Sequence, residues 1–407
     1  MGETPKWVPA SVGAAARHGT ATAEDLLSGK AWEAMLASLR AAGAVLRGDR
    51  APQSLLEQAA GYQHLLSMIA LGVDDALRPS DPYNPKIAAG STDAVFKWGM
   101  DCPDAAYVGA GIRGDATYRV RGARGSVRYL GFQIMGGMAS TANVVADDLP
   151  LSRDGDLELV LSPEKQDGNW MPLDPSSSAL IVRQFFYDWE REEPSRLTIE
   201  CLTRPPSAAP PTPTPETIAR QLVALGEFVE ASLAFWLDLE EAGRAAGLNC
   251  FREPNARTDM GGAAENVSVW GSWELRRDEA LVIEVTPPPA LYWSVALGNY
   301  WWESLDYANY QTSLNGHQAT LDGDGVFRAV VSARDPGVAN WLDNRGFGKG
   351  PMIFRWLRAG STPVPATRVV AVDDLEAALP ETARVTPAQR QQVLTARRQG
   401  IRKRFPR

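Results

Sequence analysis

The sequence predicts a mainly β protein that contains two tandem β-sandwich units, with helices before, between and after them. Short β-branched or aromatic segments separated by turn residues occupy two long stretches of the chain, which is typical of antiparallel β domains. A proline-rich segment and a long amphipathic pattern lie between these stretches. One set of motifs recurs in the same order in both stretches, which indicates an internal duplication.

Residues 1–78 are predicted to form an N-terminal helical cap of two helices. Apolar residues recur there at helical spacing: Leu26, Leu27, Trp32, Met35, Leu36 and Leu39, then Leu55, Leu56, Ala59, Leu65, Leu66 and Ile69. The break between the helices is expected at residues 48–52, GDRAP, because Gly and Pro provide turn chemistry.

Residues 79–204 are predicted to form the first β-sandwich unit. Its expected strands are AVFKWG, AAYVGAGI, ATYRVRG, VRYLGFQIM, LELVLS, ALIVRQFFYDW and RLTIEC. Residues 205–248 begin with the linker PPSAAPPTPTP, whose prolines exclude it from a central strand or a helix interior. Thr214 and Pro215 form a helix start, and a long helix with one apolar stripe is expected to end near Gly247.

Residues 249–370 are predicted to form the second β-sandwich unit, with strands VSVWGSWEL, ALVIEV, LYWSVAL, GVFRAVVS and PMIFRWL. Residues 371–407 form a C-terminal helical tail, in which Thr386 and Pro387 repeat the helix start. Because the chain as a whole is acidic, we expect a solvated or inter-subunit helix here rather than an RNA-binding arm. The basic residues of this tail are Arg397, Arg398, Arg402, Lys403, Arg404 and Arg407.

The duplication is the most specific signal of organisation. Residues 154–170 read DGDLELVLSPEKQDGNW, and residues 322–341 read DGDGVFRAVVSARDPGVANW. Each continues through a short loop into an apolar strand that bears an arginine, Arg183 or Arg355. Because repetition in both halves favours a structural role over a single active site, most shared residues are expected to stabilise the fold. The two arginines could pair with an interior carboxylate or face a ligand.

The Asn-Trp loop followed by an arginine-bearing strand resembles the bacterial family catalogued as domain of unknown function 1214 (DUF1214), often found with domain 1254. The resemblance covers residues 81–201 and 267–358 and is clearest at ANWLDNRGFGKGPMIFRWLR in the second copy. It implies two tandem jelly-roll-like units with helical additions. Relatives usually carry an Asn-Pro-Asp-Thr-Tyr-type motif in the first unit. The matching place here reads GSTDAVFKW, which keeps Asp93 but not the Asn, the Pro or the Tyr.

Charge and composition argue against several classes of protein. The net charge of −8 and the pI near 5.2 argue against nucleic acid as a partner. The N-terminus has no apolar signal region, and LLSMIALGV at residues 65–73 is too short to span a bilayer, so no membrane partner is expected. Cys102, Cys201 and Cys250 lack CxxC spacing, which fits free thiols in a cytoplasmic protein.

The sequence contains no recognisable cofactor motif. The three histidines are isolated from one another and from the cysteines, so we expect neither a metal nor another cofactor. GAGIRG at residues 109–114 departs from GxGxxG and precedes strands rather than a helix. DGDG at residues 322–325 fits a turn better than a calcium loop. A GxSxG nucleophile elbow is also absent.

The candidate site is the aromatic stretch at residues 291–317, LYWSVALGNYWWESLDYANYQTSLNGH. Its seven aromatic rings alternate with carboxylates and amides, which suits a half-wet pocket for an organic ligand. The duplication also breaks here, because the first copy has no match to WWESLDYANY. Glu303, Asp306 and Asp93 are the candidate acid–base groups. The candidate ligand-binding residues are Trp301, Trp302, Tyr307, Tyr310, Trp98, Lys97, His317, Asn340 and Arg355.

Two functions are compatible with such a site. One is a cytoplasmic enzyme of small-molecule catabolism, a metal-independent hydrolase or lyase that acts on a polyhydroxylated or cyclic substrate by carboxylate acid–base chemistry. The alternative is a non-catalytic ligand-binding or scaffold protein that uses the same pocket. A structural interpretation also stands, in which Trp301 and Trp302 fill the interface between the sandwiches and Glu303 and Asp306 line its wet rim. A homo-oligomer is compatible with each.

Overall fold

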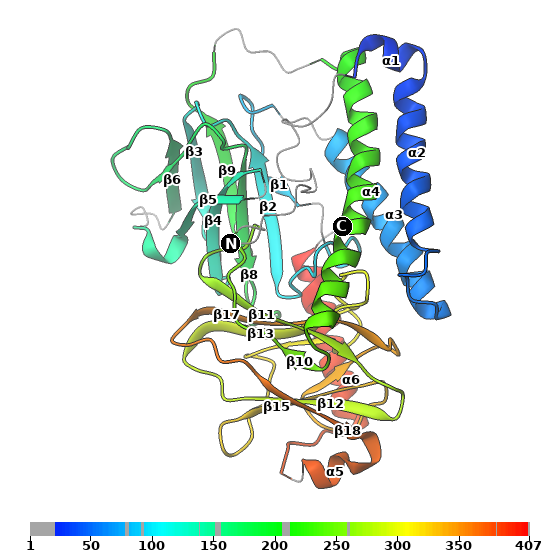
Figure 1. Cartoon of the computed structure of the whole chain (residues 1–407). Helices are drawn as coiled ribbons and strands as arrows, with labels where there is room; N and C mark the ends of the chain where they lie inside the picture. Colours follow the sequence, from blue (N-terminus) through cyan, green and yellow to red (C-terminus); the bar gives the residue numbers. More distant parts are fainter. Residues whose placement is uncertain are drawn as a thin grey trace.

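The computed structural model describes residues 21–77, 81–90, 93–137, 139–150, 156–205, 212–258, 261–379 and 381–405. These residues form four β-sheets, with helices before, between and after them (Figure 1). The predicted mainly β class is therefore confirmed. Most of the predicted DGD turn at residues 154–156 and of the linker at residues 205–215 lies outside the described residues.

The first β unit consists of two sheets with strand orders β1-β2-β8-β4-β5 and β7-β6-β3-β9. The alternation of apolar and polar residues along each strand determines which side of the strand faces the core between the two sheets. Leu157, Leu159 and Leu161 of β6 are buried in the core, whereas the alternate residues Asp156 and Glu158 are exposed. Fully burying each leucine contributes about 1.5–3 kcal/mol. The strands are β1 (Ala88–Ala89), β2 (Ala105–Gly111), β3 (Tyr118–Ala123), β4 (Tyr129–Gly136), β5 (Ala139–Val145), β6 (Asp156–Ser162), β7 (Trp170–Pro172), β8 (Ala179–Phe185) and β9 (Arg196–Cys201).

The second β unit repeats this arrangement, with strand orders β10-β11-β17-β13-β14 and β16-β15-β12-β18. Adding nine to each strand number of the first unit gives the second, which confirms the duplication. The strands are β10 (Cys250–Phe251), β11 (Asn266–Glu274), β12 (Glu279–Val285), β13 (Ala290–Leu297), β14 (Ser313–Asn315), β15 (Phe327–Ser332), β16 (Trp341–Asp343), β17 (Lys349–Ala359) and β18 (Ala366–Ala371).

The repeated Asn-Trp motif has the same structural role in both units. The Asn169 amide donates to the carbonyl oxygens of Pro150 and Glu158, both at 2.8 Å. The Asn340 amide donates to those of Thr320 and Arg328, at 2.6 and 2.9 Å. Each asparagine thus fixes the loop before the parallel pair β6–β7 or β15–β16. The expected structural role of the shared residues holds at this motif.

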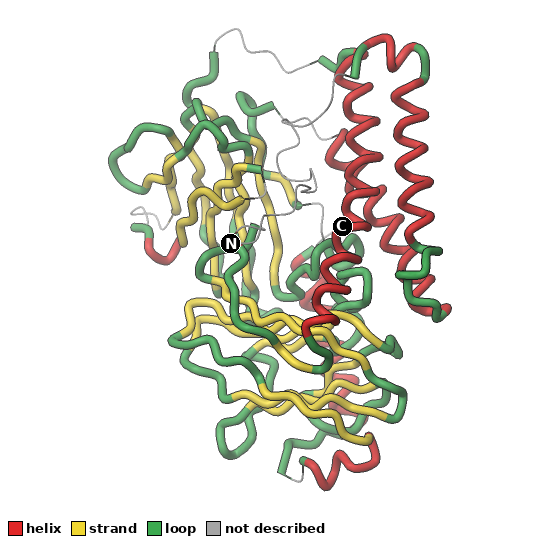
Figure 2. The backbone as a smooth tube through the Cα atoms, in the orientation of Figure 1, coloured by secondary structure: helices red, strands yellow, loops and turns green. Residues whose placement is uncertain are grey.

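The helices lie beside the first unit and along the second (Figure 2). α4 begins where predicted, because the Thr214 hydroxyl accepts a hydrogen bond from the Thr217 backbone at 3.2 Å and Pro215 fits the first turn. The N-terminal region forms three helices rather than the two predicted. The helices are α1 (Ala23–Leu27), α2 (Lys30–Val45), α3 (Leu55–Leu77), α4 (Pro215–Ala246), α5 (Leu375–Ala378) and α6 (Pro387–Arg404), with 3₁₀ turns η1 (Ala146–Asp148) and η3 (Val372–Asp374).

The two strand arginines join the β units to each other. Arg183 on β8 donates to the carbonyl oxygen of Gly261, and Arg355 on β17 donates to that of Met100 at 2.7 Å. Gly261 and Met100 lie five residues before the equivalent strands β11 and β2, and both have positive φ, 78° and 53°. Neither guanidinium forms an ion pair with a carboxylate within the described part of the chain. Each unit therefore binds the segment that leads into β2 or β11 of the other unit, and the two contacts are related by pseudo-symmetry. We call these two segments the entry segments.

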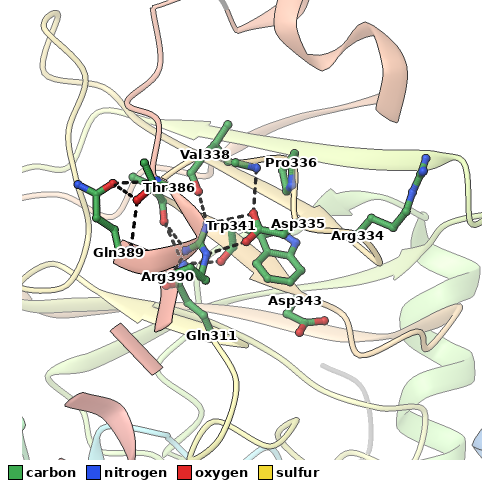
Figure 3. Close-up of polar contacts among 12 residues, drawn as sticks. Gln311, Arg334, Asp335, Pro336, Val338, Trp341, Asp343, Thr386, Gln389 and Arg390 are labelled. Carbon is green, nitrogen blue, oxygen red and sulfur yellow. Dashed lines mark hydrogen bonds and ion pairs between the residues drawn. The ribbon is translucent and has the colours of Figure 1, made fainter. Parts of the chain in front are cut away.

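α6 is solvated on one side only, so the predicted solvated or inter-subunit helix is wrong for the side that carries three of its arginines. Arg390, Arg397 and Arg404 lie seven residues apart, share one side of the helix and are buried. In Figure 3 the Arg390 guanidinium faces Asp335 and the Trp341 ring. The Asp335 carboxylate lies 2.9 Å from Nε of Arg390, and the guanidinium carbon lies 5.3 Å from the centre of the Trp341 ring. Stacking on rings and donation to fixed oxygens compensate for burying the charge.

Candidate functional site

The connection between β13 and β14, residues 298–312, is the inserted segment that has no counterpart between β4 and β5. α6 holds it from one side, because Arg397 donates to the carbonyl oxygens of Tyr307 and Ser313 at 3.0 and 3.1 Å. α3 holds it from another side, where the Trp301 indole donates to the carbonyl oxygen of Glu57 at 2.9 Å. A Cβ on Gly61 would lie 2.7 Å from the Trp301 ring, so only glycine permits this approach.

The predicted half-wet character holds for only part of this segment: Asp306, Asn309 and Tyr310 reach solvent, whereas residues 299–305 are buried. Trp301, Trp302 and Tyr307 are each 1% exposed, and Glu303 is 5% exposed, so Glu303 does not lie at a wet rim. The covering elements are α3, α4 and the segment at residues 93–104, all distant in sequence. The predicted strand over residues 94–99 is also wrong, because the Asp93 carboxylate accepts from the Val95 and Phe96 amides at 2.6 and 2.9 Å and forms a turn.

Four tryptophans gather around the contact of α4 with the inserted segment and β11. Figure 1 shows the end of α4 beside the sheet that contains β11. Trp236 of α4 stacks on Trp302 with ring centroids 5.4 Å apart. Trp270 of β11 meets Trp302 edge-on at 5.0 Å, and Trp98 meets Trp236 edge-on at 5.0 Å. We call these four residues the tryptophan cluster. Trp98 and Trp302 were predicted from the sequence, whereas Trp236 and Trp270 were not.

Several polar atoms of this cluster are buried without a hydrogen-bond partner. All four indole N–H groups belong to this class, as do both carboxyl oxygens of Glu240 on α4 and the hydroxyl of Ser272 on β11. Most buried donors in folded proteins are paired, so such a concentration needs an explanation. Indole donors and an acid gathered among rings are the groups that could hold the polar edges and apolar faces of an organic molecule.

Glu240 is the ionisable group of the cluster, and it is fully buried. Burial raises the pKa of Glu240 to about 8, although Arg244, the Trp302 indole and the Ser272 hydroxyl lie close enough to favour its charged form. Neither Trp302 nor Ser272 meets hydrogen-bond geometry with it. Glu240 is therefore mostly protonated at neutral pH and can donate a proton.

The backbone around the tryptophan cluster contains unusual conformations. Met100, Trp302 and Arg257 have positive φ angles of 53°, 60° and 55°, which non-glycine residues rarely adopt. The Met100 amide donates to the Trp302 carbonyl oxygen at 2.7 Å, and the Arg257 guanidinium covers the Trp270 ring at 4.3 Å. The position equivalent to Met100 in the other unit is a glycine. Strained residues of this kind concentrate at functional sites.

A polar network lies directly behind the cluster. Lys97 donates to the Ser304 hydroxyl at 2.8 Å, and that hydroxyl donates to Asp101 at 2.8 Å. Burial lowers the pKa of Lys97 and raises the pKa of Asp101. Lys97 also lies 4.0 Å above the ring of Tyr307. Two predicted ligand-binding residues are thus brought together, but their bonds tie the segment at residues 93–104 to the inserted segment.

Glu303 belongs to a second buried pair. Its carboxylate accepts from the Asn299 amide at 2.8 Å and lies 3.2 Å from Nδ1 of His64 on α3. Both ring nitrogens of His64 lack a hydrogen-bond partner of good geometry. Glu303 follows Trp302 directly, so this acid–imidazole pair borders the tryptophan cluster.

The remaining predicted residues have local partners. Asp306 accepts from the Asn309 backbone at 3.1 Å, and Tyr310 lies under Arg345, 3.4 Å from the guanidinium carbon. His317 is exposed, with Nε2 3.7 Å from the Asp188 carboxylate. Asn340 fixes the loop before β16, and Arg355 reaches the cluster only through Met100. Of the predicted set, Lys97, Trp98, Trp301, Trp302, Glu303 and Tyr307 therefore lie at or beside the cluster.

An open depression of about 540 Å³ lies on another part of the surface, and no member of the tryptophan cluster lines it. Its lining combines charges of both signs, including Glu57, Glu274, Arg276 and Lys349. Within the described residues, no group of three or more His, Cys, Asp or Glu side chains is placed to hold a metal ion. Likewise, none of the described helices combines the length and the apolar character that crossing a membrane requires.

Among solved structures, the chain is similar to a protein from Burkholderia cenocepacia. A crystal structure of an uncharacterised protein from Burkholderia cenocepacia superposes with a TM-score of 0.80 and 33% sequence identity, covering 86% of this chain and 99% of that chain. A protein from Vibrio parahaemolyticus matches with a TM-score of 0.44 and 13% identity over 76% of this chain and 96% of that one. No family model and no curated protein matches the chain.

Proposed function

Because the chain belongs to the family of the Burkholderia cenocepacia protein, whose description names no activity, we propose a function from the site alone. The chain binds a small cyclic organic molecule at the tryptophan cluster and uses Glu240 as a proton donor to it. The observation that carries this proposal is the set of buried, unpartnered polar atoms on Trp98, Trp236, Trp270, Trp302 and Glu240.

The chemistry of these groups suits a flat or ring-shaped ligand. Indole faces hold the apolar faces of rings, and indole N–H groups donate to hydroxyl or carbonyl oxygens at their edges. Glu240, with a pKa of about 8, is ready to protonate a leaving oxygen or a carbonyl at neutral pH. Glu303, held by Asn299 and close to His64, is the second carboxylate available for an acid–base pair. A hydrolase or lyase without a metal fits this set.

A non-catalytic binding protein is the second candidate. It is favoured by the enclosure of Glu303, since Asn299 already occupies one carboxylate oxygen and His64 lies at the other. In this case Glu240 would donate a hydrogen bond to the ligand and no proton would be transferred.

A ligand screen tests the binding proposal. Monosaccharides, cyclic acids and aromatic metabolites are added to the protein, and thermal shifts are recorded. A ligand present at a hundred times its Kd stabilises the folded state by about 2.7 kcal/mol. We expect hits whose shift is lost in Trp98→Leu, which removes a half-buried ring of the cluster. The shift should persist in the control Trp32→Leu, which removes an exposed tryptophan from α2.

Glu240→Gln separates the two candidates. The amide keeps the size of the side chain but cannot act as an acid. Turnover of a hit compound should fall by about 10²-fold or more if Glu240 is the proton donor, while the Kd changes only a few-fold. Equal turnover in the variant and the wild type would refute the acid role.

Three further expectations stay proposals. The duplicated topology is compatible with the resemblance to DUF1214 proteins, and we propose that relationship on the Asn-Trp and arginine motifs. All three cysteines are free, which supports the proposal of a cytoplasmic location. A carbohydrate remains one ligand class to be screened.

A further inference from the structure

The third helix, α3, has the reverse polarity of an ordinary surface helix. Its buried face contains mainly small and polar residues: Glu57, Ala60, Gly61, His64, Ser67, Met68, Leu71 and Gly72. On its opposite face, Leu55 is 89% exposed, Leu66 68% and Leu77 73%. A surface helix normally turns its apolar stripe toward the core and its polar face toward water. Folding of one chain therefore does not explain why leucines occupy the outer face.

The exposed residues form one continuous line. Leu55, Leu66 and Leu77 are eleven residues apart, which is close to three full turns, so they align over roughly 33 Å. Tyr62 and Val73 lie on the same stripe and are 43% and 39% exposed. We call these five residues the leucine stripe. A patch of this length on a soluble protein marks an interaction site.

We propose that the leucine stripe is a homodimer interface, in which α3 packs antiparallel against α3 of a second copy across a two-fold axis at Leu66. The stripe is nearly palindromic about this residue. Leu55 and Leu77 are both eleven residues from it, so each would meet the other in the partner. Tyr62 would face Ala70, four residues on the other side. A large side chain thus meets a small one, as self-complementary packing requires.

The charges of α3 favour the same partner. Its exposed acidic residue, Asp75, lies near its C-terminal end, and α3 contains no lysine or arginine. Antiparallel pairing brings Asp75 to the N-terminal end of the other α3, where the helix dipole attracts negative charge. In the loop before that end the exposed Arg47 and Asp49 offset each other, so the attraction rests on the dipole. A lipid surface would instead favour a helix rich in lysine and arginine.

The size of the stripe predicts the strength of the dimer. One face of a helix of roughly 33 Å by 10 Å offers less than the roughly 800 Å² that each partner buries in a tight complex. We therefore expect a dimer with a Kd in the micromolar range.

Sedimentation velocity of the full chain across the micromolar range tests the proposal. Leu66→Glu should raise the Kd by at least about tenfold, without changing the thermal midpoint, because Leu66 is mostly exposed. Val369→Glu, at an exposed position of β18, is the matched control and should dimerise normally. A wild-type monomer at every concentration, or a dimer that survives Leu66→Glu, would overturn the proposal.

Cross-linking tests the geometry. In a Cys201→Ser/Cys250→Ser background, which removes the two partly exposed thiols, Leu66→Cys should form an intersubunit disulfide. Leu55→Cys alone should not, whereas an equal mixture of Leu55→Cys and Leu77→Cys chains should. Cross-linking of Leu55→Cys to itself would indicate a parallel pair and refute the two-fold axis.

Two other occupants would give distinct results. Binding of the wild type to anionic vesicles that is lost in Leu66→Glu would assign the stripe to lipid. Dimerisation that appears only after deletion of residues 1–20 would assign it to that segment of the same chain. Either result would contradict the proposal.

Discussion

The two β units share their strand order and their Asn-Trp motif, yet they contribute unequally to the candidate site: the first supplies the segment at residues 93–104, whereas the second supplies Trp270 and the inserted segment. The connection between β4 and β5 is a short turn, whereas the connection between β13 and β14 spans residues 298–312. Equivalent acids also differ. Asp104 is fully buried, while its counterpart Glu265 is half-buried. The shared residues therefore form the fold, whereas the inserted segment and the elements that cover it form the candidate site.

The largest expected effect is a difference in stability between variants of these two acids. Asp104 accepts hydrogen bonds from Asn315, Trp189 and Tyr292 at 2.6, 2.7 and 2.7 Å. Asp104→Ala should destabilise the protein by roughly 3–5 kcal/mol, because three buried donors lose their partner. Glu265→Ala should cost only about 1 kcal/mol. Urea unfolding measures both, and equal losses would contradict the asymmetry.

The next effect concerns Glu240, which α4 supplies to the second unit. Its pKa is about 8 in the folded protein against an ordinary value of 4.5, so between these values the folded state holds a proton that the unfolded chain releases. Stability should therefore fall as the pH rises from about 5 to about 8, by at most about 1.4 kcal/mol per pH unit. Urea midpoints across this range should be flatter for Glu240→Gln.

The neighbouring residue provides the control for that measurement. Glu241 is partly exposed and paired with Arg50 at 2.6 Å, so Glu241→Gln should keep the pH dependence of the wild type. If Glu240→Gln shows the same slope as the wild type, the carboxyl is not protonated in the folded state.

A smaller effect compares the repeated asparagines. Asn340 is 1% exposed, while Asn169 is half-buried, although each donates to two carbonyl oxygens. Asn340→Ala should cost about 2–3 kcal/mol and Asn169→Ala about 1 kcal/mol, because the Asn340 amide is buried whereas the Asn169 amide is partly open to water. Chemical denaturation of both variants measures the two losses in unfolding free energy. A larger loss for Asn169→Ala than for Asn340→Ala would contradict the prediction.

The smallest effect is expected at His317, which lies at the end of the aromatic stretch but outside the tryptophan cluster. Its side chain is 50% exposed and its nearest charged partner is Asp188 at 3.7 Å. His317→Ala should change stability by less than about 0.5 kcal/mol. It should also leave the affinity for any hit compound unchanged, and a lost thermal shift would place the ligand elsewhere.

The fold could be predicted from the sequence because the signals that specify it are local. Alternation along β6, the cap at Thr214 and the repeated Asn169 and Asn340 all depend on neighbours in the chain. The inserted segment could also be located, because it interrupts the repeat.

The site itself was only half predictable, because its burial depends on elements that are distant in sequence. Trp236 fits the apolar stripe of α4, and Trp270 fits a strand pattern, so neither stands out as functional. Glu240 precedes another glutamate, a pair that is typical of a solvated helix face. Only the packing of α4 on β11 turns Glu240 inward, where a Cβ on Gly243 would lie 2.8 Å from the Ser272 hydroxyl.

The contacts of Arg183 and Arg355 between the units have a consequence for how the halves can be separated. Each arginine donates a hydrogen bond to a backbone carbonyl oxygen of the opposite half. A half expressed alone would therefore contain one guanidinium and one entry segment that have lost their partners. We therefore expect neither half to be stable by itself. Mixed fragments divided in the proline-rich region should instead reassemble into the native fold by complementation.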